Sequence, residues 1–127
     1  MINFNNAYAK GSGSNSGASR LLEGASNGTT IVKSLEIITG NESSEVHIVR
    51  TDGTDNFGAL TTNGDIAGSA SVYADIVIQA KSNDYLILWE GFFVIPSGHR
   101  LYFKSDSLLC KCVVNYVDIQ GTSSPSP

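Results

Sequence analysis

The chain has 127 residues, of which 41% are hydrophobic and 16% are charged, with a net charge of −4 and a pI near 4.9. This length and apolar fraction suit one globular domain. The acidic balance argues against direct nucleic-acid binding, which needs a basic face, and against a polybasic membrane contact.

Residues 1–17, MINFNNAYAKGSGSNSG, are rich in Gly, Ser and Asn. Such a composition buries too little apolar surface to fold by itself, so we expect a flexible N-terminal arm. Phe4 and Tyr8 would be its anchors, because interfaces concentrate binding energy in buried aromatic side chains. The stretch shows no basic segment followed by an apolar run, so we expect no secretory signal and a soluble product made in the cytoplasm.

Residues 18–120 carry short β-rich runs and no helical period of any length. Gly, Asn, Asp and Pro separate the runs, and these residues tolerate or impose turn conformations. The pattern predicts an all-β domain, an antiparallel β-sandwich or jelly roll of about eight short strands. The strands are expected at residues 18–24, 29–39, 44–51, 57–62 (the weakest pattern), 71–80, 84–95, 99–105 and 108–119, and a Ser/Pro-rich tail is expected at 121–127.

The strand expected at residues 84–95 is apolar on both faces. It is therefore either covered twice or has a second face that meets a neighbour. Gly91 in its middle indicates a bend or bulge where the strand changes sheets. Pro96 and Gly98 after it predict a short hairpin connection.

The strand after this turn has one apolar face and one polar-aromatic face. Arg100, Tyr102 and Lys104 share the polar-aromatic face, because side chains alternate along a strand. We predict that these three residues, with Phe4 and Tyr8 of the arm, bind a partner protein.

The cysteines and histidines are the residues that could hold a transition metal. Cys110 and Cys112 lie two apart in an expected strand, so their side chains share one face. Zinc sites usually take cysteines spaced C-x₂₋₄-C in a loop. We therefore expect two buried thiols that act as small apolar side chains, and not a site completed by His47 and His99. His47 lies between two apolar residues of opposite parity and is expected to face solvent or an edge.

Acidic residues raise two further hypotheses. Asp52 and Asp55 lie on either side of Gly53 in RTDGTDN, but a calcium loop needs a longer series of oxygen ligands, so a turn is the simpler interpretation. Glu90 and Asp75 are the mid-strand carboxylates that a glycosidase would need in one cleft. No nucleophile motif accompanies them, and we expect no catalytic residues, no cofactor and no metal.

Three runs of the chain share a layout of strands and turns: LLEGASNGTTIVKSLEIITGNESSEVHIVRTDGT, ADIVIQAKSNDYLILWEGFFVIPSGHRLYFKSD and CKCVVNYVDI. One strand ends in Asn, a second follows a Ser pair, and a Pro-x-Gly turn comes late in the chain. These features fall on Asn41, Ser43, Ser44, Ile95, Pro96, Gly98 and Leu101. Over roughly residues 18–120, the layout resembles small β-sandwich virion proteins of tailed bacteriophages.

The resemblance implies a non-enzymatic structural role in a virion assembled in the host bacterial cytoplasm. A capsid decoration (cement) protein is the first expectation. It would bind the major capsid protein or another virion protein, and its own copies in a homo-oligomer such as a trimer. The arm at residues 1–17 would dock on a neighbouring subunit or on the capsid surface. A tail, neck or fibre-base component is the alternative within this class. From a different class, a carbohydrate-binding module would need Trp89, Tyr73 and Tyr102 exposed in a row on one sheet face.

Overall fold

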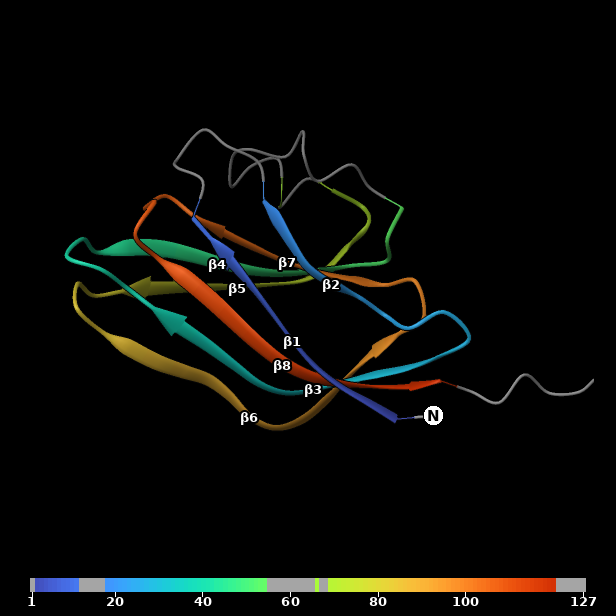
Figure 1. Ribbon diagram of the computed structural model, residues 1–127. Coiled ribbons are helices and arrows are strands. Elements are labelled where there is room, and N and C mark those ends of the chain that lie inside the picture. The colour runs from blue at the N-terminus through green and yellow to red at the C-terminus, as the bar shows by residue number, and fades with distance from the viewer. Residues whose placement is uncertain (1, 12–17, 55–65, 67–68, 121–127) are drawn as a thin grey trace, which may run out of the picture.

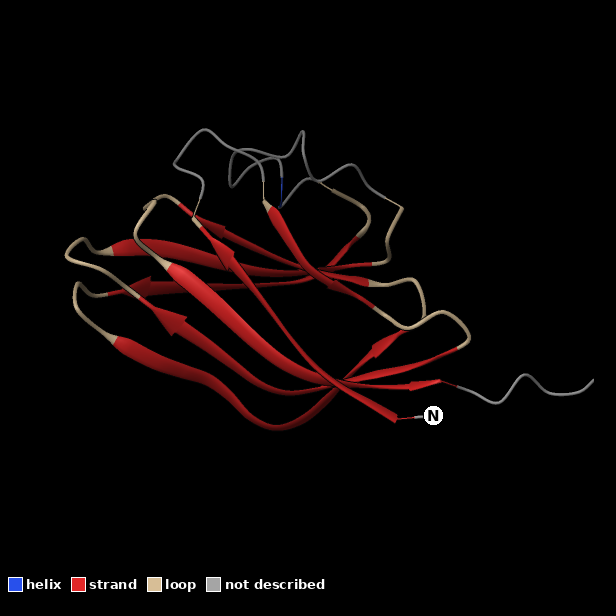
Figure 2. Ribbon diagram, viewed as in Figure 1, coloured by secondary structure: helices blue, strands red, loops and turns tan. Residues whose placement is uncertain are grey.

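A computed structural model describes residues 2–11, 18–54, 66 and 69–120. Within these residues the chain forms two four-stranded antiparallel sheets, packed face to face as a sandwich (Figures 1 and 2). The predicted all-β sandwich is therefore confirmed. The strands are β1 (Ile2–Lys10), β2 (Ser19–Glu23), β3 (Gly28–Ile38), β4 (Ser44–Thr51), β5 (Val72–Ala80), β6 (Tyr85–Pro96), β7 (Arg100–Ser105) and β8 (Lys111–Gln120).

The strand order is that of a jelly roll. Sheet A has the order β1-β8-β3-β6 and sheet B the order β2-β7-β4-β5. The first strand pairs with the last, the second with the seventh, the third with the sixth, and the fourth with the fifth. The chain is thus one long hairpin rolled over itself, which is how two Greek keys close into a double-sheet jelly roll.

The core lies between the two sheets and follows from the alternation of side chains along each strand. On β3 the side chains of Val32, Leu35 and Ile37 are fully buried, and on β7 Phe103 is 1% exposed. The spacing from Val32 to Leu35 is odd because the β3–β6 register shifts at this point. Cys112 of β8 and Cys110 just before it join the same core, which confirms the predicted pair of buried thiols.

Strand β1 corrects the expected domain boundary at residue 18. Ile2–Lys10 pairs with β8 along its whole length, so this part of the expected arm belongs to the sandwich. An edge strand needs backbone pairing and only a few inward apolar side chains, and Ala9, 7% exposed, is one of them. Residues 12–17, the weak strand at 57–62 and the tail at 121–127 lie outside the described residues.

The region from Gly91 to His99 corrects two details of β6. Gly91 has φ 122°, and the register with β3 shifts beside it, but β6 stays in sheet A throughout. The turn after β6 is present: Gly98 has φ 79°, and the His99 amide donates to the Pro96 carbonyl at 3.1 Å. The expected hairpin is wrong, however, because β6 and β7 lie in different sheets and this turn carries the chain between them.

Candidate functional site: an exposed apolar sheet face

The outer faces of the two sheets differ in how the chain covers them. On sheet B, Ile66 from the β4–β5 connection is fully buried against Val49 and Tyr102. On sheet A, the outward side chains of several strands are open to solvent. We call this outer surface of sheet A the apolar face, after its large exposed side chains: Phe4, Tyr8, Tyr85, Ile87, Val94 and Ile119.

Strand register aligns these side chains in rows across sheet A. One row runs from Phe4 of β1 through Val117 and Ile31 to Val94 of β6, and all four positions are apolar. Its two ends are the most open, with Phe4 76% and Val94 48% exposed. The row is apolar on all four strands, but Val117 in it is only 8% exposed, so its open surface is provided by Phe4, Val94 and the half-buried Ile31.

A second row crosses the sheet four residues further along β1. It runs from Tyr8 through Val113 and Glu36 to Ile87. Tyr8 is 70% exposed and Ile87 is 52% exposed. The irregular pairing of β6 lets Ile87 and Val94 both face outward. Even-numbered side chains of β6 face outward near Val94, and odd-numbered ones face outward near Ile87.

A polar row lies between these two rows. It contains Asn6, Asn115 and Ser34, and the Asn115 side-chain amide donates to Ser34 Oγ at 2.8 Å. Phe4, Asn6, Asn115 and Lys33 line a depression here, and the Lys33 ammonium lies 6.0 Å from the centre of the Phe4 ring. This distance is the outer limit for a cation–π contact.

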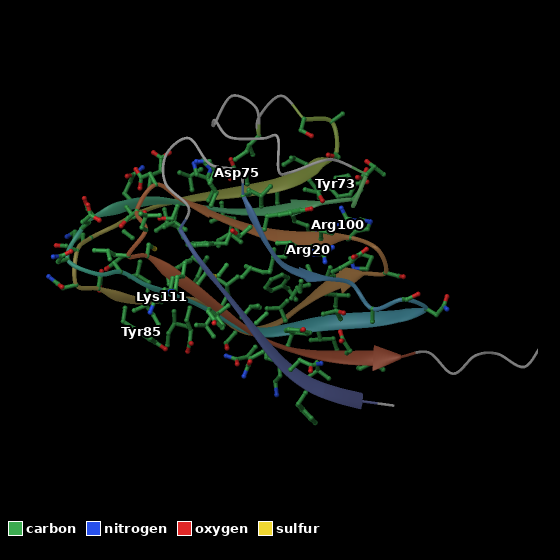
Figure 3. The ribbon with its side chains drawn as sticks, turned by 45° about the horizontal axis from the view of Figure 1, so that its top comes forward. Arg20, Tyr73, Asp75, Tyr85, Arg100 and Lys111 are labelled. Atoms are coloured by element: carbon green, nitrogen blue, oxygen red, sulfur yellow. The ribbon has the colours of Figure 1, made fainter. Side chains whose placement is uncertain are left out.

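Two further charged groups of the apolar face lie at its far end. Lys10 and Lys111 are opposite each other on β1 and β8, and the same row continues to Ile38 and Tyr85. The Tyr85 hydroxyl donates to Glu36 Oε1 at 2.5 Å, and this hydrogen bond to a carboxylate raises the pKa of Tyr85. Figure 3 shows Tyr85 and Lys111 on the sheet A side, with Tyr73 and Asp75 on sheet B.

The predicted partner-binding residues divide between the two sheets. Phe4 and Tyr8 lie on the apolar face, although as members of β1 and not of an arm. Arg100, Tyr102 and Lys104 lie on β7 of sheet B, where Tyr102 is 5% and Lys104 is 6% exposed. The prediction that these two side chains offer an open binding surface is therefore wrong, because tertiary packing covers this side of β7.

Sequence reasoning missed the β6 residues of the apolar face but noted the signal that marks them. Tyr85, Ile87 and Val94 were not selected as partner-binding positions. The strand was nevertheless recognised as apolar on both faces, with a second face that meets a neighbour as one interpretation. Because β6 ends sheet A and these side chains are about half exposed, the described chain covers only one of its two apolar faces.

His47 is the most deeply buried ionisable ring that the structure describes, and it has a structural role. Its Nδ1 lies 2.9 Å from Asp75 Oδ1, and its Nε2 lies 3.0 Å from Glu45 Oε1. Both nitrogens can donate to carboxylates at once only in the imidazolium form. The ring is 3% exposed, so the expectation of a solvent-facing histidine is wrong. The network ties β4 to β5, and both ring nitrogens are engaged in it.

The other chemical hypotheses find no common site. Asp75 and Glu90 belong to β5 and β6, which lie in different sheets. Asp52 Oδ1 accepts hydrogen bonds from the Thr54 amide at 2.9 Å and the Thr54 hydroxyl at 2.6 Å, and these bonds lower the pKa of Asp52. This is the turn predicted for RTDGTDN; Asp55 lies outside the described residues. Among the described residues, no cluster of three or more His, Cys, Asp or Glu side chains could hold a metal ion.

The three aromatic residues that a sugar-binding platform would need do not form a row. Tyr73 is 63% exposed on β5, whereas Tyr102 is buried on β7. Trp89 belongs to β6 in the opposite sheet, and its side chain lies outside the description. These three residues therefore do not share one sheet face.

Comparisons with known proteins leave the family open. No protein-family model matches the chain, and no curated protein matches its sequence. In the part of the chain that the structure describes, no helix is long and apolar enough to cross a membrane.

Proposed function

We propose that this chain is a non-enzymatic structural protein of a virion, a decoration protein that binds the head shell and its own copies. The apolar face of sheet A is the observation that carries the proposal. Soluble monomers rarely expose contiguous apolar patches beyond a few hundred Å², and larger patches mark interaction sites. The jelly-roll topology supports the same class, since capsid domains are built on it.

The polar clusters of the described residues support an assembly role over a catalytic one. The His47 network joins two neighbouring strands, and both of its acids engage the ring. At the β7–β8 connection, Ser44 Oγ contacts Ser105 Oγ and donates to Asp106 Oδ1 at 2.9 Å, while Asp106 also accepts from the Glu45 amide. These groups hold loops and strands together.

The extent of the apolar face over all four strands favours a large protein partner. Its rows cross four strands, and its members are mostly aliphatic or aromatic with few charges between them. In a particle coat many weak contacts of this kind act together, so that the avidity far exceeds the affinity of one contact. A decoration protein can therefore use a modest apolar surface effectively.

Carbohydrate binding is a second candidate, supported by the depression beside Phe4. An exposed ring lies there next to the amide side chains of Asn6 and Asn115. A ring for stacking and amides for hydroxyl groups are the combination that a sugar site needs. The aliphatic rows on both sides of the depression fit a protein partner better than a polyhydroxyl ligand.

Immunogold labelling of virions from the phage that encodes the chain tests the proposal. Regular labelling of the heads is the expected result, together with no binding of the purified chain to a glycan array. Purified virions that lack the chain would contradict the proposal. A chain that binds one glycan class, and loses this binding on Phe4→Ala, would establish the second candidate instead.

A further inference from the structure

We propose that the apolar face binds a second copy of this chain, sheet on sheet, about a two-fold axis parallel to the strands. The axis would run between β8 and β3, the two central strands of sheet A. The β1–β8 half of one copy would then cover the β3–β6 half of the other. This inference rests on the proposed assembly role and names the partner of the apolar face.

The area of the face is sufficient for such a contact. Strands lie about 4.8 Å apart and rise about 3.4 Å per residue. Four strands with the nine-residue length of β1 therefore cover about 19 Å by about 31 Å, or about 590 Å² on each copy. The two copies together would bury about 1,200 Å², which is the lower end of stable, specific protein interfaces.

The rows match when the face is turned about this axis, because each row meets the same row of the second copy. Phe4 would cover Val94, and Val117 would cover Ile31, so that the apolar row packs entirely on apolar side chains. In the polar row, Asn115 would meet Ser34. In the second row, Tyr8 would meet Ile87 and Val113 would meet Glu36, whose carboxylate accepts the hydrogen bond from Tyr85 of its own chain.

The charges favour the same orientation. Lys10 and Lys111 lie on the β1–β8 half, whereas Glu36 and the Tyr85 hydroxyl lie on the β3–β6 half at the same end of the face. The proposed axis brings Lys10 over the Tyr85 hydroxyl of the other copy and Lys111 over Ile38, one row from the Glu36 carboxylate. Lys33 is the one further described lysine on this face, and it lies beside the Phe4 ring of its own chain.

The other two-fold orientation of the face would cost more. An axis across the strands would bring the lysine row over the opposite end of the sheet, where Ile119 and Thr29 lie. Lys10 and Lys111 would then be desolvated against an apolar side chain without an opposite charge, which is unfavourable. The arrangement of charge on the face thus selects the axis parallel to the strands.

Sedimentation equilibrium of the full chain with matched lysine variants tests the pairing. The wild-type chain should approach a mass of twice 13.4 kDa at micromolar concentrations. Ile87→Lys should weaken this association at least tenfold, because a two-fold contact contains the substitution twice. Val77→Lys is the matched control: Val77 is 50% exposed against 52% for Ile87, but lies on β5 of sheet B. Circular dichroism verifies that both variants fold.

A cysteine cross-linking experiment tests the axis independently of stability. Phe4 and Val94 of one chain lie three strand spacings apart, about 14 Å, but face each other in the proposed dimer. A short bismaleimide should therefore link Phe4→Cys chains to Val94→Cys chains in a mixture, and should link neither variant to itself. The native thiols are fully buried and should stay unreacted.

Several results would overturn the pairing: a monomer or a trimer in solution, equal weakening by Val77→Lys, or cross-links of Phe4→Cys to itself. These results are distinguishable from failure of the proposed function. If the chain were monomeric in solution but immunogold labelling still placed it on virion heads, the two-fold contact alone would be rejected. A dimer that is missing from virions would reject the decoration role and keep the contact.

Discussion

Thr30 is the residue whose hydroxyl links the centre of sheet A to the β2–β3 connection. It is fully buried, its Oγ1 accepts from the Ala25 amide at 2.9 Å, and the hydroxyl donates to Asp118 Oδ1 at 2.5 Å. Thr30 is opposite Asp118 in the register, one position before the row that contains Ile31 and Val117. The hydrogen bonds therefore help to fix the register on which the apolar face depends.

Thr30→Val keeps the shape of the side chain and removes both hydrogen bonds. A hydrogen bond to a charged group contributes about 1.5–3 kcal/mol, and a buried donor left without a partner costs about 1–3 kcal/mol. Since Asp118 is partly exposed and water can replace part of the lost bond, we expect the free energy of unfolding to fall by about 2–4 kcal/mol. Thr30→Ser keeps the hydroxyl and should recover most of this loss.

Urea unfolding followed by circular dichroism measures the effect, with all variants at one low protein concentration because self-association raises apparent stability. The midpoint should fall while the slope stays unchanged, which marks a change in stability alone. Thr29→Val, at a partly exposed position on the opposite side of β3, is the control and should change stability by no more than about 0.5 kcal/mol. If Thr30→Val also stayed within about 0.5 kcal/mol of the wild type, the reasoning would be refuted.

Three further predictions concern individual groups. Burial raises the pKa of both cysteine thiols, so at pH 8 the native chain should react with a disulfide reagent only as fast as it unfolds. Fast reaction of the folded protein would contradict the packing. The free energy of unfolding should also fall as the pH rises above 9, because the thiols then ionise in the unfolded chain but stay neutral in the folded one. Glu36→Gln should lower the pKa of Tyr85 toward its usual 10.0 in an ultraviolet titration, since the hydrogen bond to the carboxylate raises it; an unchanged titration would exclude that bond. Gly53→Ala should destabilise the chain more than Gly98→Ala does. Both glycines have positive φ, but only a Cβ at Gly53 would lie 2.2 Å from a backbone carbonyl oxygen, which belongs to Gly98. Thermal unfolding compares the two variants, and the reverse order of stability would show that this close approach is absent.

Most of the sandwich follows from patterns that the sequence displays directly. The strands β2 to β8 coincide with the runs of alternating or continuous apolar residues, and the breaks between them fall at Gly, Asn, Asp and Pro. The burial of Cys110 and Cys112 was also predicted from their spacing, and the structure places Cys112 on β8 and Cys110 just before it. Local alternation and turn chemistry are sufficient for these features, because each strand has at least one face that must be buried.

The failures share a different cause, which is pairing or covering by segments far away in the sequence. β1 reads INFNNAYAK, and its order comes from hydrogen bonds to β8 and not from its own composition. His47 is buried through acids on its own and a neighbouring strand, and Tyr102 through the distant Ile66. The apolar face could be predicted only in part, because the composition of β6 shows two apolar faces but not which one the chain itself covers.

Hydroxyl-radical footprinting tests the assembly role of the apolar face most directly. It compares the oxidation rates of Phe4, Tyr8 and Tyr85 in the assembled protein with those in the dilute chain. Tyr73, 63% exposed on sheet B, is the internal reference. We predict that the three rings of the apolar face react several-fold more slowly after assembly while Tyr73 reacts at the same rate. Unchanged rates for these three rings, or protection of Tyr73 alone, would contradict the account.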